Sequence, residues 1–213
     1  MKQNTDIKEK ILAGALEIAG KTGWQETLLP AAAKAAGMNE PFGLIAFPDG
    51  VCALADYYTL HCNTKMTKQL EGKLEKRKIR EKIEDSVMAR LAIYAEHKPA
   101  VRALMAYYAL PQHSLQAAKN LALTADAMWR LAGDTSTDFN YYTKRLLLSG
   151  VYSASLLYWL SDESADMAPT REFVQRRISN VMEIQKAKSA LSGYAEKAGG
   201  VVESILPKLR AGQ

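Results

Sequence analysis

The sequence predicts an all-α fold, and three features of its composition favour that prediction. Hydrophobic residues make up 48% of the 213 residues, so most of the chain should fold. Ala and Leu greatly outnumber Val, Ile and Thr, which favours helices over strands. Only seven prolines and thirteen glycines interrupt the chain, as suits long helices. The length suffices for one helical domain with a real core, or for a small domain and a larger one.

Three helices are expected at the start of the chain. Apolar residues recur at helical spacing over residues 6–21. A second helix should run from about residue 25 to residue 36 and stop at Gly37. A third should begin near Pro41, a favourable first-turn residue, and cannot continue past Pro48.

Further helices are expected at residues 51–69, 70–96, 99–109, 114–132, 138–160 and 168–188. Lys and Arg crowd residues 65–82, which we interpret as a solvated helix face or as a docking surface for anionic headgroups or an acidic partner. The helix at 138–160 is the most apolar. Its charge-free part is too short to span a bilayer, so a buried central helix is expected.

The pattern predicts three parts: a three-helix module at 1–48, a helical body at 49–188 and a separate tail at 189–213. The two cysteines, Cys52 and Cys62, have no disulfide framework around them, which favours a reducing compartment. The N-terminus has no apolar signal segment, so we expect a bacterial cytoplasmic protein or a mature form without its presequence. The net charge of +5 would suit nucleic acid, an anionic membrane or an acidic partner equally.

The first three helices resemble the helix-turn-helix region of TetR-type regulators, and an all-helical body behind them fits the same architecture. The residues argue against DNA reading. The expected recognition helix, 40–47, offers one acid and otherwise apolar groups, whereas base edges require Arg, Lys, Asn, Gln or Ser. Lys34 is the only cation within 25–50, so phosphate contacts are also weak and no nucleic-acid partner is expected.

The sequence contains no recognisable catalytic or metal-binding pattern. His61, His97 and His113 have no Glu or His at metal-ligand spacing on one helix face, and there is no Cys-x-x-Cys. No phosphate-binding, dinucleotide-binding or nucleophile-elbow motif occurs. The clustered acids at 162–166 are interpreted as helix caps. We therefore expect a non-enzymatic protein without a metal or another cofactor.

The apolar excess allows two interpretations. Methionines are spread through the helices, where they fill irregular apolar gaps: Met66, Met88, Met105, Met128, Met167 and Met182. They indicate either an ordinary core or a cavity for an apolar ligand between helices.

The tail forms an amphipathic, cationic pattern. Gly199-Gly200 weakens this helix by about 1 kcal/mol per glycine, so it suits a segment that folds as it docks on a membrane. The alternative is a terminal helix packed on its own protein or on a dimer mate. The expected membrane-contacting residues are Leu191, Tyr194, Ala198, Val201, Val202, Ile205 and Leu206.

Residues 133–145 carry more polar and aromatic groups than a helix connection needs. Gly133 is a good C-terminal cap, and the Thr/Ser/Asp run after it offers N-cap oxygens for the next helix. Capping requires about two such residues. Here two tyrosines and a basic pair follow at once, which indicates a function beyond capping.

Taken together, the chain resembles the ubiquinone biosynthesis accessory family, a TetR-like group of lipid-binding proteins from mitochondria and alphaproteobacteria. The resemblance is strongest over 126–182 and includes the long, irregular Gly-Asp-to-Arg run at 133–145, where the family often has Trp in place of Tyr141. Further matches are Asp126-x-x-Trp129, Val151-Tyr152, Trp159-x-x-Asp162, Phe173-x-x-Arg176-Arg177-Ile178 and Phe47-Pro48-x-Gly50.

The resemblance implies an all-α, TetR-like homodimer that binds an isoprenoid quinone or a phospholipid. The protein would present the quinone intermediate to demethoxyubiquinone hydroxylase, and its tail would touch the inner membrane from the bacterial cytoplasm or the mitochondrial matrix. The residues expected to contact the partner are Asp134, Thr137, Asp138, Asn140, Tyr141, Tyr142 and Arg145. The residues expected to contact lipid are Met88, Met105, Met128, Leu147, Val151, Tyr152 and Leu156.

Two alternatives stay open on sequence alone. One is a TetR-family transcriptional regulator that senses a hydrophobic effector. The other is a general phospholipid-binding peripheral protein without a quinone role.

Overall fold

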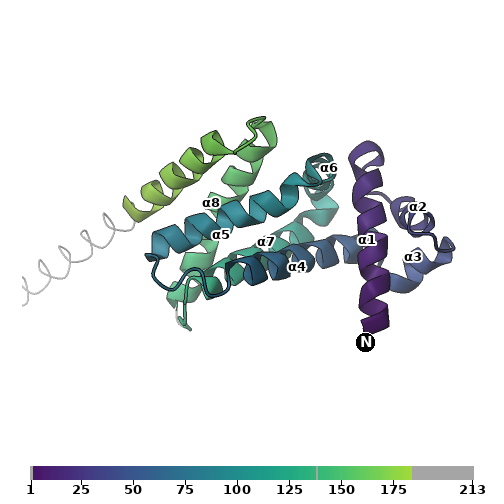
Figure 1. Ribbon diagram of the computed structural model, residues 1–213, viewed down its shortest axis with the longest axis horizontal. Coiled ribbons are helices and arrows are strands. Elements are labelled where there is room, and N and C mark those ends of the chain that lie inside the picture. The colour runs from purple at the N-terminus through teal and green to yellow at the C-terminus, as the bar shows by residue number, and fades with distance from the viewer. Residues whose placement is uncertain (1, 138, 184–213) are drawn as a thin grey trace, which may run out of the picture. The chain divides into compact units, whose positions relative to one another are not determined.

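The computed structural model describes residues 2–137 and 139–183, and each regular element in these ranges is a helix (Figure 1). This confirms the all-α prediction. The elements are α1 (Lys2–Thr22), α2 (Leu28–Ala35), α3 (Pro41–Ala46), α4 (Gly50–Leu70), α5 (Ile79–Ala95), α6 (Lys98–Tyr108), the 3-10 turn η1 (Pro111–His113), α7 (Ser114–Leu131) and α8 (Phe139–Ser161). A further helix begins at residue 168 and is described up to residue 183.

Contacts divide the chain into two units, Met1–Val174 and Gln175–Gln213. The first unit holds α1 to α8, and the described part of the second, 175–183, is helical. The predicted boundaries at residues 48 and 188 stay predictions. The residues predicted to contact a membrane, 191–206, lie outside the described ranges.

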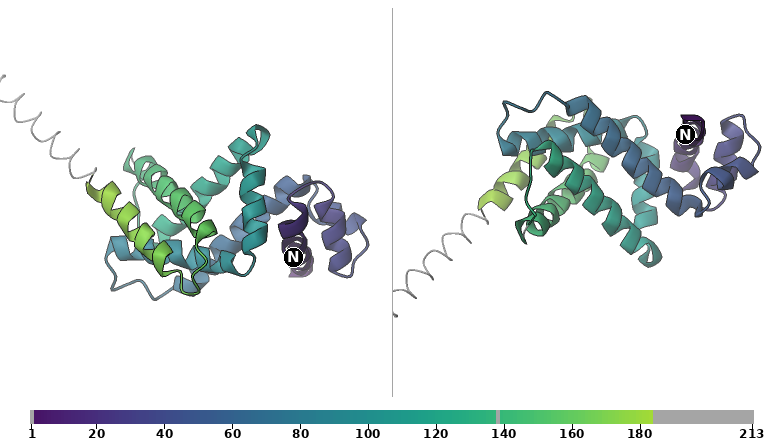
Figure 2. Two further views of the ribbon diagram at one scale, coloured as in Figure 1. Left: turned by 90° about the horizontal axis from the view of Figure 1, so that it is seen from above. Right: turned by 90° about the horizontal axis from the view of Figure 1, so that it is seen from below.

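The three N-terminal helices form a group at one end of the first unit (Figure 2). Glycines let their backbones approach closely, because a Cβ at Gly43 of α3 would lie 2.5 Å from the Leu29 carbonyl oxygen of α2. A Cβ at Gly14 of α1 would likewise lie 2.8 Å from the Ala32 oxygen. The group is tied to α6 by the Trp24 indole, whose Nε1 donates to the Ala100 carbonyl at 3.0 Å.

A chain of buried aromatic rings runs through the core of the first unit. Trp24 stacks on Tyr58 of α4 at 6.1 Å between ring centroids, Tyr58 meets Tyr94 of α5 at 5.5 Å, and Tyr94 meets Trp159 of α8 at 6.4 Å. Aromatic pairs at these separations add stabilisation beyond the area that they bury. The rings therefore join the N-terminal group to α4, α5 and α8.

The predicted basic helix at 70–96 is wrong in its first turns. The structure ends α4 at Leu70 and begins α5 at Ile79. Between them Gly72 has a φ of +73°, a left-handed value that breaks a helix, and Leu74 is buried. The backbone N–H of Lys78 donates to the Glu81 carboxylate at 2.9 Å, which caps the new helix.

The prediction that α8 is a buried central helix is wrong for one of its faces. One face packs inward and includes Leu148, Tyr152 and Trp159. The other face presents a row that we call the α8 stripe, which consists of Tyr142, Leu146, Gly150 and Leu157. The side chains of Tyr142, Leu146 and Leu157 are 61–74% exposed. Among the described residues, no helix is both long and apolar enough to cross a membrane.

Candidate functional site

The connection between α7 and α8 begins with the predicted glycine cap. Gly133 has a φ of +87°, and its N–H donates to the Arg130 carbonyl at 3.0 Å. The N–H of Asp134 donates to the Trp129 carbonyl at 3.0 Å. These two bonds form a Schellman motif, which confirms Gly133 as a C-terminal cap.

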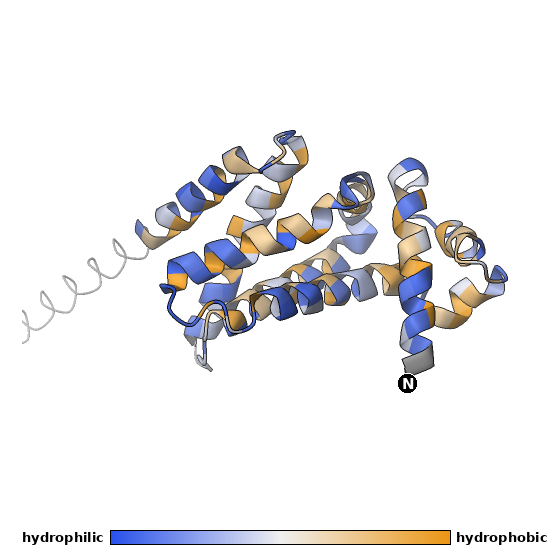
Figure 3. Cartoon of the chain, in the orientation of Figure 1, coloured by the Kyte–Doolittle hydropathy of each residue, from blue (hydrophilic) through white to orange (hydrophobic). Residues whose placement is uncertain are grey.

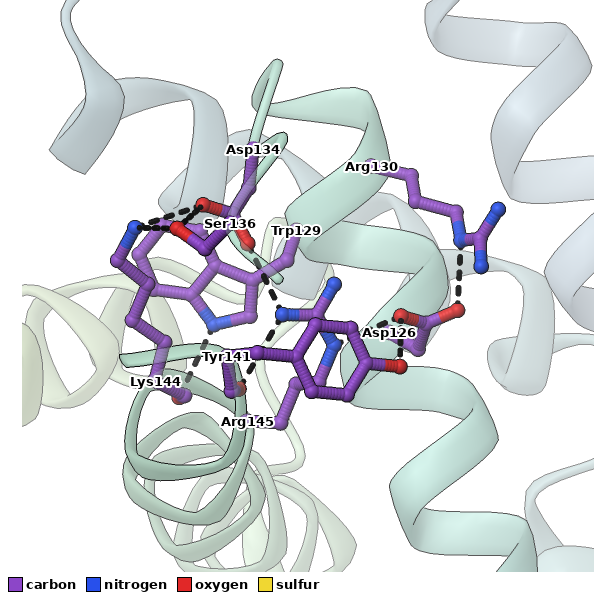
Figure 4. Close-up of polar contacts among 8 residues, drawn as sticks. All are labelled: Asp126, Trp129, Arg130, Asp134, Ser136, Tyr141, Lys144 and Arg145. Carbon is purple, nitrogen blue, oxygen red and sulfur yellow. Dashed lines mark hydrogen bonds and ion pairs between the residues drawn. The ribbon is translucent and has the colours of Figure 1, made fainter. Parts of the chain in front are cut away.

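Two carboxylates and two cations then tie this connection to both helices (Figure 4). The Arg145 guanidinium donates to Asp126 of α7 at 2.7 Å and to Asp134 of the connection at 2.9 Å. The Lys144 ammonium donates to the other Asp134 oxygen at 2.6 Å, and the Ser136 hydroxyl donates to the same oxygen at 2.8 Å. We call Asp126, Asp134, Lys144 and Arg145 the junction network.

Aromatic side chains complete the junction network (Figure 4). The Tyr141 hydroxyl donates to Asp126 at 3.1 Å, and the Arg145 guanidinium lies 3.5 Å from the centre of the Tyr141 ring. The Trp129 Nε1 donates to the Lys144 carbonyl at 3.0 Å. The first turns of α8 are therefore anchored to α7 by side chains as well as by the chain connection.

Each charge of the junction network is paired, and Asp126 also accepts from Arg130 of α7 at 2.7 Å. Burial by itself would raise the pKa of Asp134, but bonds from Lys144, Ser136 and Arg145 outweigh burial and hold that pKa well below its usual range. The pKa of Asp126 is lowered in the same way, chiefly by Arg145 against the effect of burial. Both carboxylates thus stay ionised and paired at neutral pH, which suits a structural clamp better than acid–base chemistry.

The structure sorts the residues predicted to contact a partner into two groups. Asp134, Tyr141 and Arg145 are held inside the junction network by hydrogen bonds. Thr137, Asn140 and Tyr142 are exposed, and Asp138 lies outside the described residues. Tyr142 is 70% exposed and meets the Tyr141 ring edge-on at 5.2 Å.

Sequence reasoning missed one exposed residue beside this group. Leu146 lies one turn after Tyr142 on the α8 stripe and is 74% exposed. The four-residue spacing from Tyr142 to Leu146 places both residues on one helix face. The expectation of a buried central helix gave no reason to regard that face as exposed.

A cavity of about 190 Å³ lies between α4, α5, α6, α7 and α8. Its polar lining comes from Thr59, Tyr94, Tyr108, Asn120, Thr124, Tyr152 and Ser153, and its apolar lining from Met105, Ala117, Leu121, Leu156 and Leu157. Leu157 is 61% exposed, so the cavity reaches the surface at the α8 stripe.

Three of the seven residues predicted to contact lipid line this cavity: Met105, Tyr152 and Leu156. Met88, Met128 and Val151 are instead buried in the core, and Leu147 is half-buried outside the lining. The methionines were chosen for their apolar character, which a core and a cavity share. The tyrosines and Asn120 that line the cavity give no distinctive sequence signal.

A buried arginine lies behind the cavity wall. Arg90 of α5 is fully buried; its Nε donates to Asn63 at 3.1 Å and its Nη2 donates to the Tyr94 hydroxyl at 2.9 Å. The guanidinium also lies 4.2 Å from the centre of the Tyr94 ring. Tyr94 therefore separates a buried positive charge from the cavity that it lines.

A second, polar cleft of about 500 Å³ lies beside the end of α8. Its cations are committed to the last turn of that helix, because Lys98 donates to the Asp162 carbonyl and Arg102 donates to the Leu160 carbonyl at 2.7 Å. Cations at a helix C-terminus stabilise it. The two cations that line this cleft therefore serve to cap the C-terminus of α8.

Of the acids predicted to be caps, Asp162 and Asp166 accept backbone hydrogen bonds. Asp162 accepts from the backbone N–H groups of Ser164 and Thr170, at 2.9 and 3.1 Å. Asp166 accepts from the N–H of Ala168, where the next helix begins, at 3.1 Å. In the part of the chain that the structure describes, no group of three or more His, Cys, Asp and Glu residues could hold a metal ion.

The element in the position of a DNA-recognition helix is short and apolar. Helix α3 has six residues, and Figure 3 shows it as mostly hydrophobic. Phe42, Leu44 and Ile45 are exposed on it, and none of them can hydrogen-bond to a base edge.

Comparisons with known proteins agree on one family. The COQ9 family model matches residues 115–185. The human ubiquinone biosynthesis protein COQ9, mitochondrial, is 31% identical over 187 residues, which cover 83% of this chain and 58% of the relative. The rat protein of the same name is 32% identical over 187 residues, covering 83% and 59%. The chain thus spans less than two thirds of the length of these relatives.

A solved structure shows the same fold. A TetR transcriptional regulator from Nitrosomonas europaea superimposes with a TM-score of 0.67 and 19% sequence identity, over 82% of this chain and 97% of the regulator. This confirms the TetR-like architecture and, at this level of identity, concerns the fold alone.

Proposed function

We propose that the chain is a member of the COQ9 family and a non-enzymatic accessory protein of ubiquinone biosynthesis, because the COQ9 family model matches residues 115–185 and the relatives named COQ9 are 31–32% identical. It binds an isoprenoid quinone lipid in the cavity and presents it to demethoxyubiquinone hydroxylase at the membrane. The relatives are named mitochondrial proteins, and the corresponding place for this chain is the inner membrane, on the matrix side or, in a bacterium, on the cytoplasmic side.

The α8 stripe is the observation that carries this proposal. Exposed rows of large apolar side chains on one helix face are typical of protein-binding surfaces. The stripe begins at Tyr142, beside the junction network, and ends at Leu157, which lines the cavity. These residues are 15 positions apart, about 22 Å along a helix. A partner docked on the stripe would therefore also cover the cavity opening.

The junction network supports the stripe by fixing its first turn. Tyr141 and Arg145 are hydrogen-bonded to Asp126 of α7, so the backbone that carries Tyr142 and Leu146 is held in place before a partner arrives. A preorganised surface loses less conformational entropy on binding. Asp134 and Arg145 would then act on partner binding indirectly, by positioning this turn.

Two single substitutions test the partner surface with the purified hydroxylase. Tyr142→Ala and Leu146→Ala should each weaken binding about tenfold or more, as expected for large exposed anchors, and should leave the thermal midpoint nearly unchanged. Ile45→Ala is the matched control, because Ile45 is 68% exposed on α3, away from the stripe. Wild-type hydroxylase affinity in both stripe variants would refute the proposal. Loss of a dimer instead would make the stripe a subunit interface.

Lipid and membrane binding are tested separately. Native mass spectrometry of the purified protein should detect an isoprenoid quinone, whereas phospholipid alone would favour a general lipid-binding role. Deletion of 189–213 should abolish liposome binding without unfolding the body. Unchanged liposome binding would remove the tail from the proposal.

A further inference from the structure

The net positive charge of the chain is concentrated in residues 65–82, which we call the basic segment. This segment holds eight Lys and Arg residues against three Glu residues, a surplus of five cations. The whole chain carries 28 Lys and Arg residues against 23 Asp and Glu residues, a net charge of +5. The basic segment therefore accounts for the entire net charge, and the remainder of the chain is neutral as a whole.

Most cations of the basic segment have no partner within the protein. The segment covers the end of α4, the α4–α5 connection and the start of α5 (Figure 1). Arg77 pairs with Asp85 at 3.4 Å, and the Lys82 ammonium donates to the Ala132 carbonyl at 3.3 Å. Six other cations are exposed and form no ion pair with a carboxylate that the structure describes: Lys65, Lys68, Lys73, Lys76, Lys78 and Arg80.

Helix stability does not explain where these cations lie. Lys78 immediately precedes α5 and Arg80 lies in its first turn, where the helix dipole disfavours positive charge. Lys68 lies favourably in the last turn of α4, but Lys73 and Lys76 belong to no helix. Repulsion among the like charges adds to the cost. The cluster therefore opposes folding stability, which favours a role in binding an anionic surface.

An exposed apolar side chain lies within the cluster. Ile79 is 59% exposed between Lys78 and Arg80, whereas Leu74 is buried and anchors the connection to the core. Cations interspersed with an exposed apolar group are typical of segments that bind anionic bilayers. Five of the six unpaired cations are Lys, a compact charge that suits a diffuse field of headgroups, whereas recognition of single carboxylates favours the planar fork of Arg. The composition thus favours a lipid surface over an acidic protein.

The basic segment lies at the same end of the first unit as the start of α8 (Figure 1). The bond from Lys82 of α5 to the Ala132 carbonyl joins the segment to the end of α7, just before the connection to α8. A bilayer in contact with the basic segment would therefore lie beside the end of the α8 stripe that begins at Tyr142. In the proposed function, that stripe binds a membrane enzyme.

Resting on the membrane location in the proposed function, we propose that the basic segment is a second membrane-contacting surface, selective for anionic lipid. Its six unpaired cations approach the headgroups, and Ile79 enters the boundary between headgroups and acyl chains. The segment adds to the tail, as a polybasic surface adds to a weak apolar anchor.

Co-sedimentation of the full-length protein with vesicles tests this surface, using phosphatidylcholine alone or with about 30% phosphatidylglycerol. A Lys near an anionic surface contributes about fivefold to affinity, so Lys73→Gln combined with Lys76→Gln should weaken binding to the anionic vesicles by about ten- to thirtyfold. Binding to phosphatidylcholine alone should not change.

The matched control is Lys21→Gln combined with Lys34→Gln. It removes the same charge from exposed lysines of α1 and α2, in the N-terminal group away from the basic segment (Figure 1). Because salt screens distant charges, this control should change the affinity by less than about threefold. Ile79→Ala should weaken binding to the anionic vesicles about fivefold or more through lost apolar contact, and the thermal midpoint should stay near that of the wild type.

Several results would overturn the proposal. These are wild-type vesicle affinity in the Lys73 and Lys76 variant or in Ile79→Ala, an equal loss in the control variant, or an equal loss on both kinds of vesicle. Unchanged vesicle binding with weaker binding to the purified hydroxylase would also overturn it and assign the segment to an acidic protein partner. If the wild type binds neither kind of vesicle, this inference and the membrane part of the proposed function both fail, whereas the stripe is tested separately by hydroxylase affinity.

Discussion

Asp134→Asn tests whether the junction network clamps α7 to α8. The Asp134 side chain is 4% exposed and is bonded to Arg145 at 2.9 Å and to Lys144 at 2.6 Å. A buried hydrogen bond to a charged group contributes about 1.5–3 kcal/mol, and the bond to the one-third-exposed Lys144 adds about 0.5–1 kcal/mol. Arg145 keeps Asp126 as a partner, and Asn keeps one acceptor oxygen. The free energy of unfolding should therefore fall by about 2–3 kcal/mol at pH 7, and the thermal midpoint by roughly 4–12 °C.

The effect of Asp134→Asn should depend on pH in one direction. The pKa of Asp134 is lower in the folded protein than in the unfolded chain, where it is about 3.9. Its contribution to stability is therefore fully present above that value and is lost as the pH falls through the folded pKa. The difference between wild type and variant should be constant from pH 7 to about pH 5 and should narrow below about pH 4.

Urea unfolding at a series of pH values measures this difference. Asp6→Asn is the control, because Asp6 forms an exposed ion pair with Lys10 at 2.9 Å and should change the stability little. A loss below about 0.5 kcal/mol at pH 7, or a difference that stays constant down to pH 2.5, would refute the clamp.

Three further substitutions test packing and capping. Gly43→Ala should lower the free energy of unfolding by about 1–3 kcal/mol, because its Cβ would lie 2.5 Å from the Leu29 carbonyl oxygen; a neutral effect in urea unfolding would contradict this contact. Gly150→Ala should instead raise it by about 0.5–1 kcal/mol, since its Cβ would meet nothing within 4 Å. Burial opposes ionisation of Asp162, but its hydrogen bonds lower the pKa to about 2. Asp162→Asn should therefore lower the thermal midpoint at pH 7, and the difference should shrink as the pH falls from about 4 toward 2; a pH-independent difference would argue against Asp162 as an ionised cap.

Helices whose ends carry local signals were predictable from sequence. The third helix begins at Pro41 and ends before Pro48, and Gly133 ends α7, all as expected. The start of α5 was not predictable, because Lys and Glu at 70–78 are good helix formers. The left-handed Gly72 and the burial of Leu74 decide that break, and the burial depends on contacts distant in sequence.

The candidate site also has features that were predictable from sequence and features that were not. The unusual composition of 133–145 identified the region and the family resemblance, because residue types and spacing are local properties. Sequence alone could not say that Asp134 and Arg145 pair with each other while Tyr142 stays exposed. It also could not separate the methionines of the core from the single methionine, Met105, that lines the cavity.

The sequence by itself determined an all-α chain, most helix ends, the apolar character of α3 and the COQ9 resemblance. Each of these follows from periodicity, capping residues or local composition. Only the tertiary structure decided which polar groups of 126–145 bond to one another in the junction network, and which face of α8 is exposed. It also decided that Tyr94, Asn120 and Tyr152 line a cavity. The physical reason is that burial and hydrogen-bond satisfaction depend on neighbours brought together by folding, and those neighbours come from helices far apart in the chain.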